Sequence, residues 1–139
     1  MTFLDRFPPV VRNQGPAIAW ALVIFIASSF SHVPGPRLGF QFEDKWHHLI
    51  VYGLLGFLVA RAFRYQSRFP RLKERLFFWT WLTGTLYGIS DEIHQYFVPG
   101  RFADVGDALA DSLGAALGAW LFLAWMARRR RRGLAPAED

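Results

Sequence analysis

Long apolar segments separated by short charged stretches constrain the fold of this chain more than any other feature. Four such segments cover residues 16–31, 46–63, 76–96 and 107–127, and hydrophobic residues make up 53% of the sequence. A helix needs about 20 mostly apolar residues to cross a bilayer, and three segments reach about that length when their polar ends are counted. The pattern predicts an all-α fold, a four-transmembrane-helix bundle, formed by one domain over residues 1–139. A soluble bundle of buried helices is the alternative.

The positions of the basic residues predict the orientation of this bundle. Thirteen of the 16 Lys and Arg precede the first segment, lie between the last turn of the second and the start of the third, or follow the fourth, where residues 128–139 form a basic tail. Cytoplasmic connections of membrane proteins carry such an excess of Lys and Arg. Both termini and the middle connection are therefore expected in the cytoplasm. Gly15 and Pro16 indicate the start of the first helix, which we interpret as an uncleaved anchor because it lacks a clear cleavage site.

Charge and cysteine content exclude several classes of function. A formal net charge of +5 is compatible with nucleic-acid binding, but the basic residues cluster directly beside apolar segments. Membrane topology accounts for that distribution, and no nucleic-acid partner is expected. The chain contains no cysteine, which excludes disulfides, thiolate zinc sites and cysteine nucleophiles.

Polar residues are concentrated at the helix ends that this topology places outside the cytoplasm. Spacings of three and four residues put them on one face of each helix. An ionisable group that faces lipid costs ~2.5–3.5 kcal/mol, so these faces are expected to turn inward toward one shared pocket. The residues are Asp44, His48 and Tyr52 on the second helix, Asp91, Glu92 and Gln95 on the third, and Asp104, Asp107 and Asp111 on the fourth.

Helix capping is the simpler interpretation of some of these carboxylates. Asp44 and Asp104 suit N-cap positions, and Asp107 suits the first turn of the fourth helix. Capping does not explain Asp111, which lies a turn inside that helix, nor the adjacent acidic pair of the third helix.

Counter-charges and small residues complete this end of the bundle. Lys45 and Arg101 are expected either to neutralise the carboxylates or to grip an anion together. Four glycines at a spacing of four residues predict close contacts between helices. They are Gly84, Gly88, Gly114 and Gly118.

Three spaced motifs carry a family resemblance. The stretch "DKWHHLIVYGLLGFL" is followed by "YGISDEIHQYFVPGRFADVGDALADSLGAALG". They resemble the VanZ-like family of small bacterial membrane proteins, whose pattern is D-K-x-x-H-x-x-x-Y, then D-E-x-x-Q with P-G-R, then D-x-x-x-N with a following Gly. The matching residues are Asp44, Lys45, His48, Tyr52, Asp91, Glu92, Gln95, Pro99, Gly100, Arg101, Asp107 and Gly114.

One position departs from the family pattern. Asp111 stands where the family usually has Asn, which adds a potential charge within the membrane. This carboxyl is expected either to be protonated or to pair with Lys45 or Arg101.

The resemblance implies a setting but no reaction. The family takes its name from a component of glycopeptide-antibiotic resistance clusters that is associated with low-level teicoplanin resistance. It implies a multi-pass protein of the bacterial inner (cytoplasmic) membrane that works at the cell envelope, with both termini inside. No catalytic role comes with it.

Two functions fit the polar pocket. In the first, the protein binds or acts on an envelope lipid-linked precursor or a lipophilic glycopeptide, with membrane lipid as its other partner. Asp91, Glu92 and His48 are then hypothetical acid and base groups. The expected ligand-binding residues are Asp44, Lys45, Tyr52, Gln95, Arg101, Asp107 and Asp111. In the second, the protein is a non-enzymatic subunit or binding protein, and the polar cluster is structural.

Metal and ion-path functions have weaker support from the sequence. No paired H-x-x-x-H spacing is present, so no metal and no cofactor are assigned. A metal site built from His48, Asp44, Asp91 and Glu92 is the alternative. A proton or ion path is disfavoured because the inner halves of the segments carry almost no ionisable residue.

Overall fold

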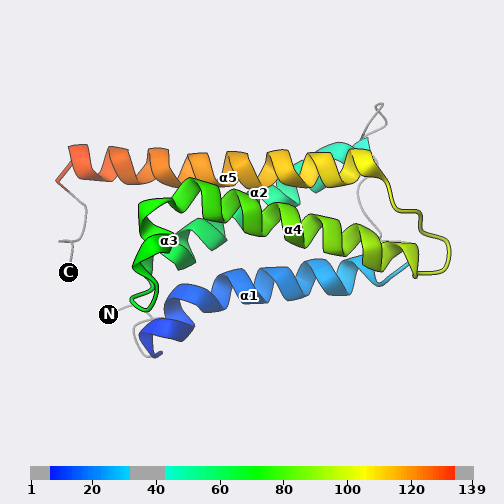
Figure 1. Ribbon diagram of the computed structural model, residues 1–139, viewed down its shortest axis with the longest axis horizontal. Helices are drawn as coiled ribbons and strands as arrows, with labels where there is room; N and C mark the ends of the chain where they lie inside the picture. The colour runs from blue at the N-terminus through cyan, green and yellow to red at the C-terminus, as the bar shows by residue number, and fades with distance from the viewer. Residues whose placement is uncertain (1–6, 32–42, 134–139) are drawn as a thin grey trace.

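The protein is built from helices. The computed structural model describes residues 7–31 and 43–133, and within these ranges it contains five helices and no strand, which confirms the all-α prediction. The four long helices lie side by side, and a short one joins two of them at the end of the molecule where the first helix begins and the last one ends (Figure 1). The elements are α1 (Pro9–Ser28), α2 (Glu43–Tyr65), α3 (Pro70–Glu74), α4 (Leu76–Tyr96) and α5 (Val105–Arg131).

The closest contact in the molecule is between α2 and α5, and it depends on glycine. A Cβ atom on Gly114 would come within 2.5 Å of the Leu49 carbonyl oxygen, and one on Gly118 would meet the backbone of Gly53 and Phe57. These neighbours are backbone atoms, which cannot rotate away as a side chain can. Small residues let the two helix backbones approach in this way, as the sequence predicts.

The helix α4 packs in the same manner against α5. A Cβ on Gly84 would overlap Ala115, and Ser112 accepts a hydrogen bond from the Trp81 indole at 3.0 Å and shares one with Thr85 at 2.9 Å. Glycine contacts and a small polar network therefore fix α4 along the central pair.

Side chains rather than close backbone contacts attach α1. The Trp20 indole donates to the Val51 carbonyl of α2 at 3.0 Å, and the Tyr87 hydroxyl of α4 donates to the Ala21 carbonyl at 2.6 Å. Ala17 and Ile24 complete an apolar cluster with α2.

The start of α1 differs from the prediction. The helix begins at Pro9 rather than at Pro16, and Pro16 lies inside it. Proline has no N–H and leaves the carbonyl four residues earlier, that of Arg12, without its helical hydrogen bond. The Arg61 guanidinium of α2 donates to the carbonyls of Arg12 and Asn13, both at 3.1 Å, so the helix continues through the proline.

Other boundaries move outward from the predicted segments. The helix α2 covers residues 43–65 instead of 46–63, and α5 starts at Val105 and runs through Arg131 into the basic tail. Asp104 caps α5, and arginine is a good helix former, so nothing stops the helix at residue 127. The short α3, which starts at Pro70, was not predicted. Residues 32–42, between the first two segments, lie outside the described residues.

Three of these helices are long and apolar enough to cross a membrane, namely α1, α2 and α5. Their outward faces carry large apolar side chains that are half exposed or more, among them Ile18, Ile50 and Leu113. Lipid would solvate such faces. The helix α4 is also 21 residues long, but its tryptophans, threonines and polar last turns lower its hydropathy.

Adding one methyl group on either side of the α2–α5 contact should have opposite effects. Gly118→Ala is expected to lower the melting temperature in detergent, because its Cβ meets backbone and overpacking costs about 1–3 kcal/mol. Gly53→Ala is the matched control, since its Cβ would lie 3.7 Å from the nearest atom and alanine favours helix. Equal stability of the two variants would contradict this account of the contact.

Candidate functional site

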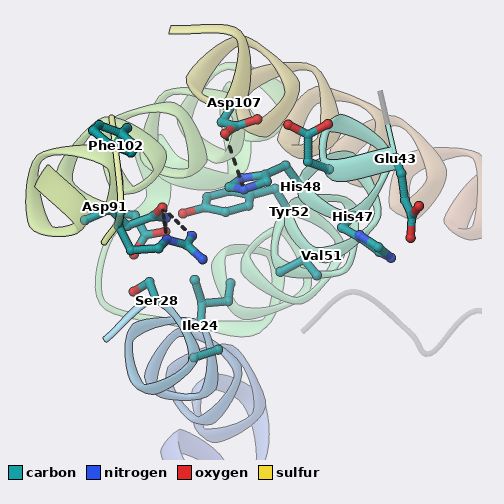
Figure 2. Close-up of a pocket in the computed structure, with 14 residues that line it drawn as sticks. Ile24, Ser28, Glu43, His47, His48, Val51, Tyr52, Asp91, Phe102 and Asp107 are labelled. Atoms are coloured by element: carbon teal, nitrogen blue, oxygen red, sulfur yellow. Dashed lines mark hydrogen bonds and ion pairs between the residues drawn. The ribbon is translucent and has the colours of Figure 1, made fainter. Parts of the chain in front are cut away.

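A half-open pocket lies at the end of the molecule opposite α3, between α1, α2, α4 and the start of α5 (Figure 2). It encloses about 580 Å³. One wall is apolar and comes from Ile24, Ala27 and Val51, while polar side chains form the rest. The polar lining residues are Ser28, Glu43, Asp44, His47, His48, Tyr52, Asp91, Gln95, Arg101 and Asp107, and Phe102 lies beside them.

Lys45 neutralises the acidic start of α5. Its ammonium lies 3.1 Å from an Asp44 oxygen, 2.5 Å from Asp104 and 2.7 Å from Asp107. Asp104 also caps α5, because its other oxygen accepts a hydrogen bond from the Gly106 N–H at 2.6 Å. The bonds from Lys45 and from the Gly106 N–H hold the pKa of Asp104 below its ordinary value. The capping interpretation and the counter-charge interpretation are therefore both correct for Asp104.

Asp111 pairs with a histidine. Its Oδ1 lies 2.9 Å from His48 Nδ1, and the side chain is fully buried. Of the two alternatives expected for Asp111, pairing with Lys45 or Arg101 is therefore wrong, and protonation is the other. Lys45 is held by carboxylates at the rim, whereas His48 lies one turn further along α2, level with Asp111. Gly88 of α4 makes room for this carboxylate, since a Cβ there would lie 2.7 Å from the Asp111 Cβ.

The polar end of α4 forms a relay of hydrogen bonds. The Gln95 amide donates to Asp91 Oδ2 at 3.0 Å, and the Gln95 carbonyl oxygen accepts from Arg101 Nε at 3.2 Å and from its Nη2. Gln95 is thereby held in one orientation. Within residues 7–31 and 43–133, Arg101 has no carboxylate within ion-pair distance.

Glu92 lies behind the pocket lining. Its Oε2 accepts a hydrogen bond from the Asp104 backbone N–H at 2.8 Å, which ties the end of α4 to the start of α5. The side chain is 5% exposed. An adjacent acidic pair on one helix thus points in two directions, Asp91 into the pocket and Glu92 toward α5.

Several buried oxygens at this end have no hydrogen-bond partner among the described residues. They are the Tyr52 hydroxyl, Asp91 Oδ1, Glu92 Oε1 and Asp111 Oδ2. Buried polar groups in proteins are nearly always hydrogen-bonded, and an unsatisfied one costs about 1–3 kcal/mol. Clustering of four of them at one end of the molecule is typical of a site that binds something.

Seven of the ten residues predicted for the site line the pocket, and three lie just behind it. Lining residues are Asp44, His48, Tyr52, Asp91, Gln95, Arg101 and Asp107, while Lys45, Glu92 and Asp111 hold them. Sequence reasoning missed the contributions of α1, because its apolar residues look like those of any lipid-facing helix. His47 also lines the pocket, and His94 hydrogen-bonds with Ser29 at 3.0 Å.

Two clusters have the ligand types of a metal site. The atoms of His48, Glu92 and Asp107 form one, and those of Asp44, Asp104 and Asp107 form the other. The Lys45 ammonium already lies within the second cluster. The metal set considered from the sequence contained Asp91, which belongs to neither.

The apolar helices and the polar pocket together define a helical integral membrane protein. A model of the VanZ/LLP1 family matches residues 15–127, and the chain belongs to that family. Comparisons with curated proteins and with solved structures gave no significant match.

Removal of the Lys45 charge should destabilise the pocket in a pH-dependent way. Lys45→Met leaves three carboxylates facing one another at pH 7, so we expect a melting temperature several degrees below that of the wild type. Because the pKa of Asp104 is lowered in the folded state, its ion pair stabilises the fold above about pH 4, the ordinary Asp range, and this is lost at lower pH. The difference should therefore shrink toward pH 3.

Lys73→Met removes the same charge from α3, at the other end of the molecule, and serves as the control. Equal losses in the two variants at pH 7 would mean that net charge, and not the Lys45 contacts, explains the effect.

Proposed function

We propose that this protein binds the polar head of an envelope amphiphile, such as an anionic lipid, a lipid-linked precursor or a lipophilic glycopeptide, in the pocket between α1, α2 and α4. The single observation that carries the proposal is Arg101. Its guanidinium faces the pocket and bonds only to the neutral Gln95 among the described residues. A phosphate or carboxylate would accept its remaining hydrogens, and arginine matches both anions in geometry.

The neighbouring oxygens support an amphiphile whose head also donates hydrogen bonds. Asp91 Oδ1 and the Tyr52 hydroxyl are buried, line the same pocket and have no partner among the described residues. A hydroxyl or ammonium group of a head group would satisfy Asp91. A purely structural cluster would be expected to satisfy its own members, so these free oxygens favour binding.

The apolar wall accounts for the rest of such a ligand. Ile24 and Ala27 of α1 lie opposite the polar side chains, and α1 touches α4 only sparsely. Acyl or polyprenyl chains would lie along this apolar helix while the head remains in the pocket. Membrane lipid would then surround α1 and also supply the ligand of the pocket.

The proposal includes a four-helix arrangement in the inner membrane, with both termini in the cytoplasm. The beginning of α1, the end of α5 and the basic connection around α3 lie at one end, and the pocket lies at the other (Figure 1). Since α4 joins α3 to the pocket end and packs along α5, it is the fourth crossing. The excess of Lys and Arg at the α3 end supports placing that end inside.

Catalysis requires an acid and a base that both reach the ligand. His48 and Asp91 line the pocket, whereas Glu92 does not. Binding is proposed first because it rests on Arg101 and the unpaired oxygens, which need no turnover, and the test below depends on none.

Removing the Arg101 guanidinium should weaken binding of an anionic head group. Arg101→Gln is expected to bind short-chain phosphatidylglycerol about tenfold more weakly, since a charged hydrogen bond contributes ~1.5–3 kcal/mol. Native mass spectrometry of the detergent-solubilised protein, titrated with this lipid and with phosphatidylcholine, would measure it.

Arg71→Gln makes the same change on exposed α3 and should bind like the wild type. If the two variants bind phosphatidylglycerol equally well, Arg101 is not the site of head-group binding.

The orientation can be tested with single cysteines, because the chain has none. A membrane-impermeant maleimide should label Ala103→Cys in intact cells and Ser67→Cys only after permeabilisation. The reverse pattern would place the pocket in the cytoplasm and remove envelope ligands from the proposal.

A further inference from the structure

We propose that His48, Glu92 and Asp107 bind a divalent transition-metal ion at the floor of the pocket. These residues come from α2, α4 and α5, so the ion would join three helices. Each offers one ligand atom, and the three atoms lie within 4.8 Å of one another. The inference is independent of head-group binding, because Glu92 does not line the pocket and Arg101 is not a ligand.

Each of the three side chains is oriented by a bond that leaves another ligand atom available. His48 uses Nδ1 to bond Asp111 at 2.9 Å, Asp107 uses Oδ1 to bind Lys45 at 2.7 Å, and Glu92 uses Oε2 to accept from the Asp104 N–H at 2.8 Å. Metal-binding histidines in proteins almost always donate their second ring nitrogen to a carboxylate or carbonyl. Asp111 supplies that carboxylate here.

The electrostatics of the cluster call for a cation. When Asp111 is ionised it can only accept, and a neutral His48 then carries its proton on Nδ1 and a lone pair on Nε2. That nitrogen lies 3.8 Å from Asp107 Oδ2. In that protonation state two electron-rich atoms face each other, and a cation would offset their repulsion.

Glu92 provides an independent indication of a ligand. Its side chain is 5% exposed, and Oε1 has no hydrogen-bond partner among the described residues. A buried carboxylate oxygen without a partner is costly, and a metal ion would satisfy it. A ligand atom of Glu92 lies within 4.8 Å of those of His48 and Asp107.

The ligand set suits zinc or a similar ion. One imidazole nitrogen and two carboxylate oxygens are common zinc ligands, at about 2.0–2.2 Å. Small side-chain rotations would draw the three atoms onto one ion. Three protein ligands leave a fourth position, which would open toward the pocket because His48 and Asp107 line it (Figure 2).

Zinc titration of the full-length protein in detergent, after removal of metal with a chelator, tests the inference. Isothermal titration calorimetry with Zn²⁺ alone, together with metal analysis after gel filtration, should give one ion per chain for the wild type. Glu92→Gln should weaken binding at least tenfold. Asp111→Asn keeps a hydrogen-bond acceptor but removes the charge and should weaken binding about 10-fold or more.

Two further variants locate the ion. Asp44→Asn removes a member of the other acidic cluster and should bind zinc like the wild type, as should Arg101→Gln, which affects only the proposed head-group site. Circular dichroism and the gel-filtration profile would show that each variant is folded. Binding should weaken as the pH falls from 7 to 5.5, because protons compete for His48 Nε2.

The outcomes that overturn the inference are distinct. If the wild type binds no zinc, or if Glu92→Gln binds it equally well, no metal site exists at these residues. A proton on His48 is then the cation between them. Loss of binding in Asp44→Asn alone would place the ion in the exposed cluster with Asp104.

Discussion

The contact between α2 and α5 determines the geometry of everything at the pocket end. Gly114 lies against the Leu49 carbonyl, and one turn earlier on α5 the next residue on that face is Asp111. His48 precedes Leu49. The register that places Gly114 against the α2 backbone therefore also places the buried Asp111 carboxylate 2.9 Å from His48 Nδ1. The packing of the membrane-length helices and the chemistry of the site are set by one alignment of two helices.

The site divides into two halves that differ in whether their charged groups form ion pairs. Around Lys45, three carboxylates bond to one ammonium, so each of them has a cationic partner. Around Arg101, the only partner among the described residues is a neutral amide, and oxygens of Tyr52 and Asp91 remain unbonded. The first half explains how an acidic rim is stable, and the second explains why a ligand would be held. Direct ion pairing, rather than polarity alone, distinguishes the Lys45 half from the Arg101 half.

The sequence predicts helices, their polar ends and the glycine contacts, because these depend on local spacing and on the cost of polar groups in lipid. It does not predict the partners of those polar groups. The partners depend on how each helix is rotated about its axis and how far it is shifted along that axis relative to its neighbours. The sequence predicts that Asp111 is protonated or pairs with Lys45 or Arg101, whereas its partner in the structure is His48. Pro16 was expected to start α1, but the donor that allows the helix through it, Arg61, is 45 residues away and carries no local signal. The sequence does not predict the apolar wall of the pocket either, because the contact between α1 and the other helices also depends on helix rotation.

The attachment of α1 has a mechanical consequence. The helix lacks the glycine-on-backbone contacts that join α2, α4 and α5, and instead relies on single side-chain bonds such as those of Trp20 and Tyr87. Breaking these bonds would shift Ile24 and Ala27, the part of the apolar wall that α1 supplies. The alignment of His48 with Asp111 would not be disturbed. The α2, α4 and α5 side of the pocket would thus stay in place while the α1 side moves. An amphiphile that enters from the bilayer would need to displace only the side that lipid already covers.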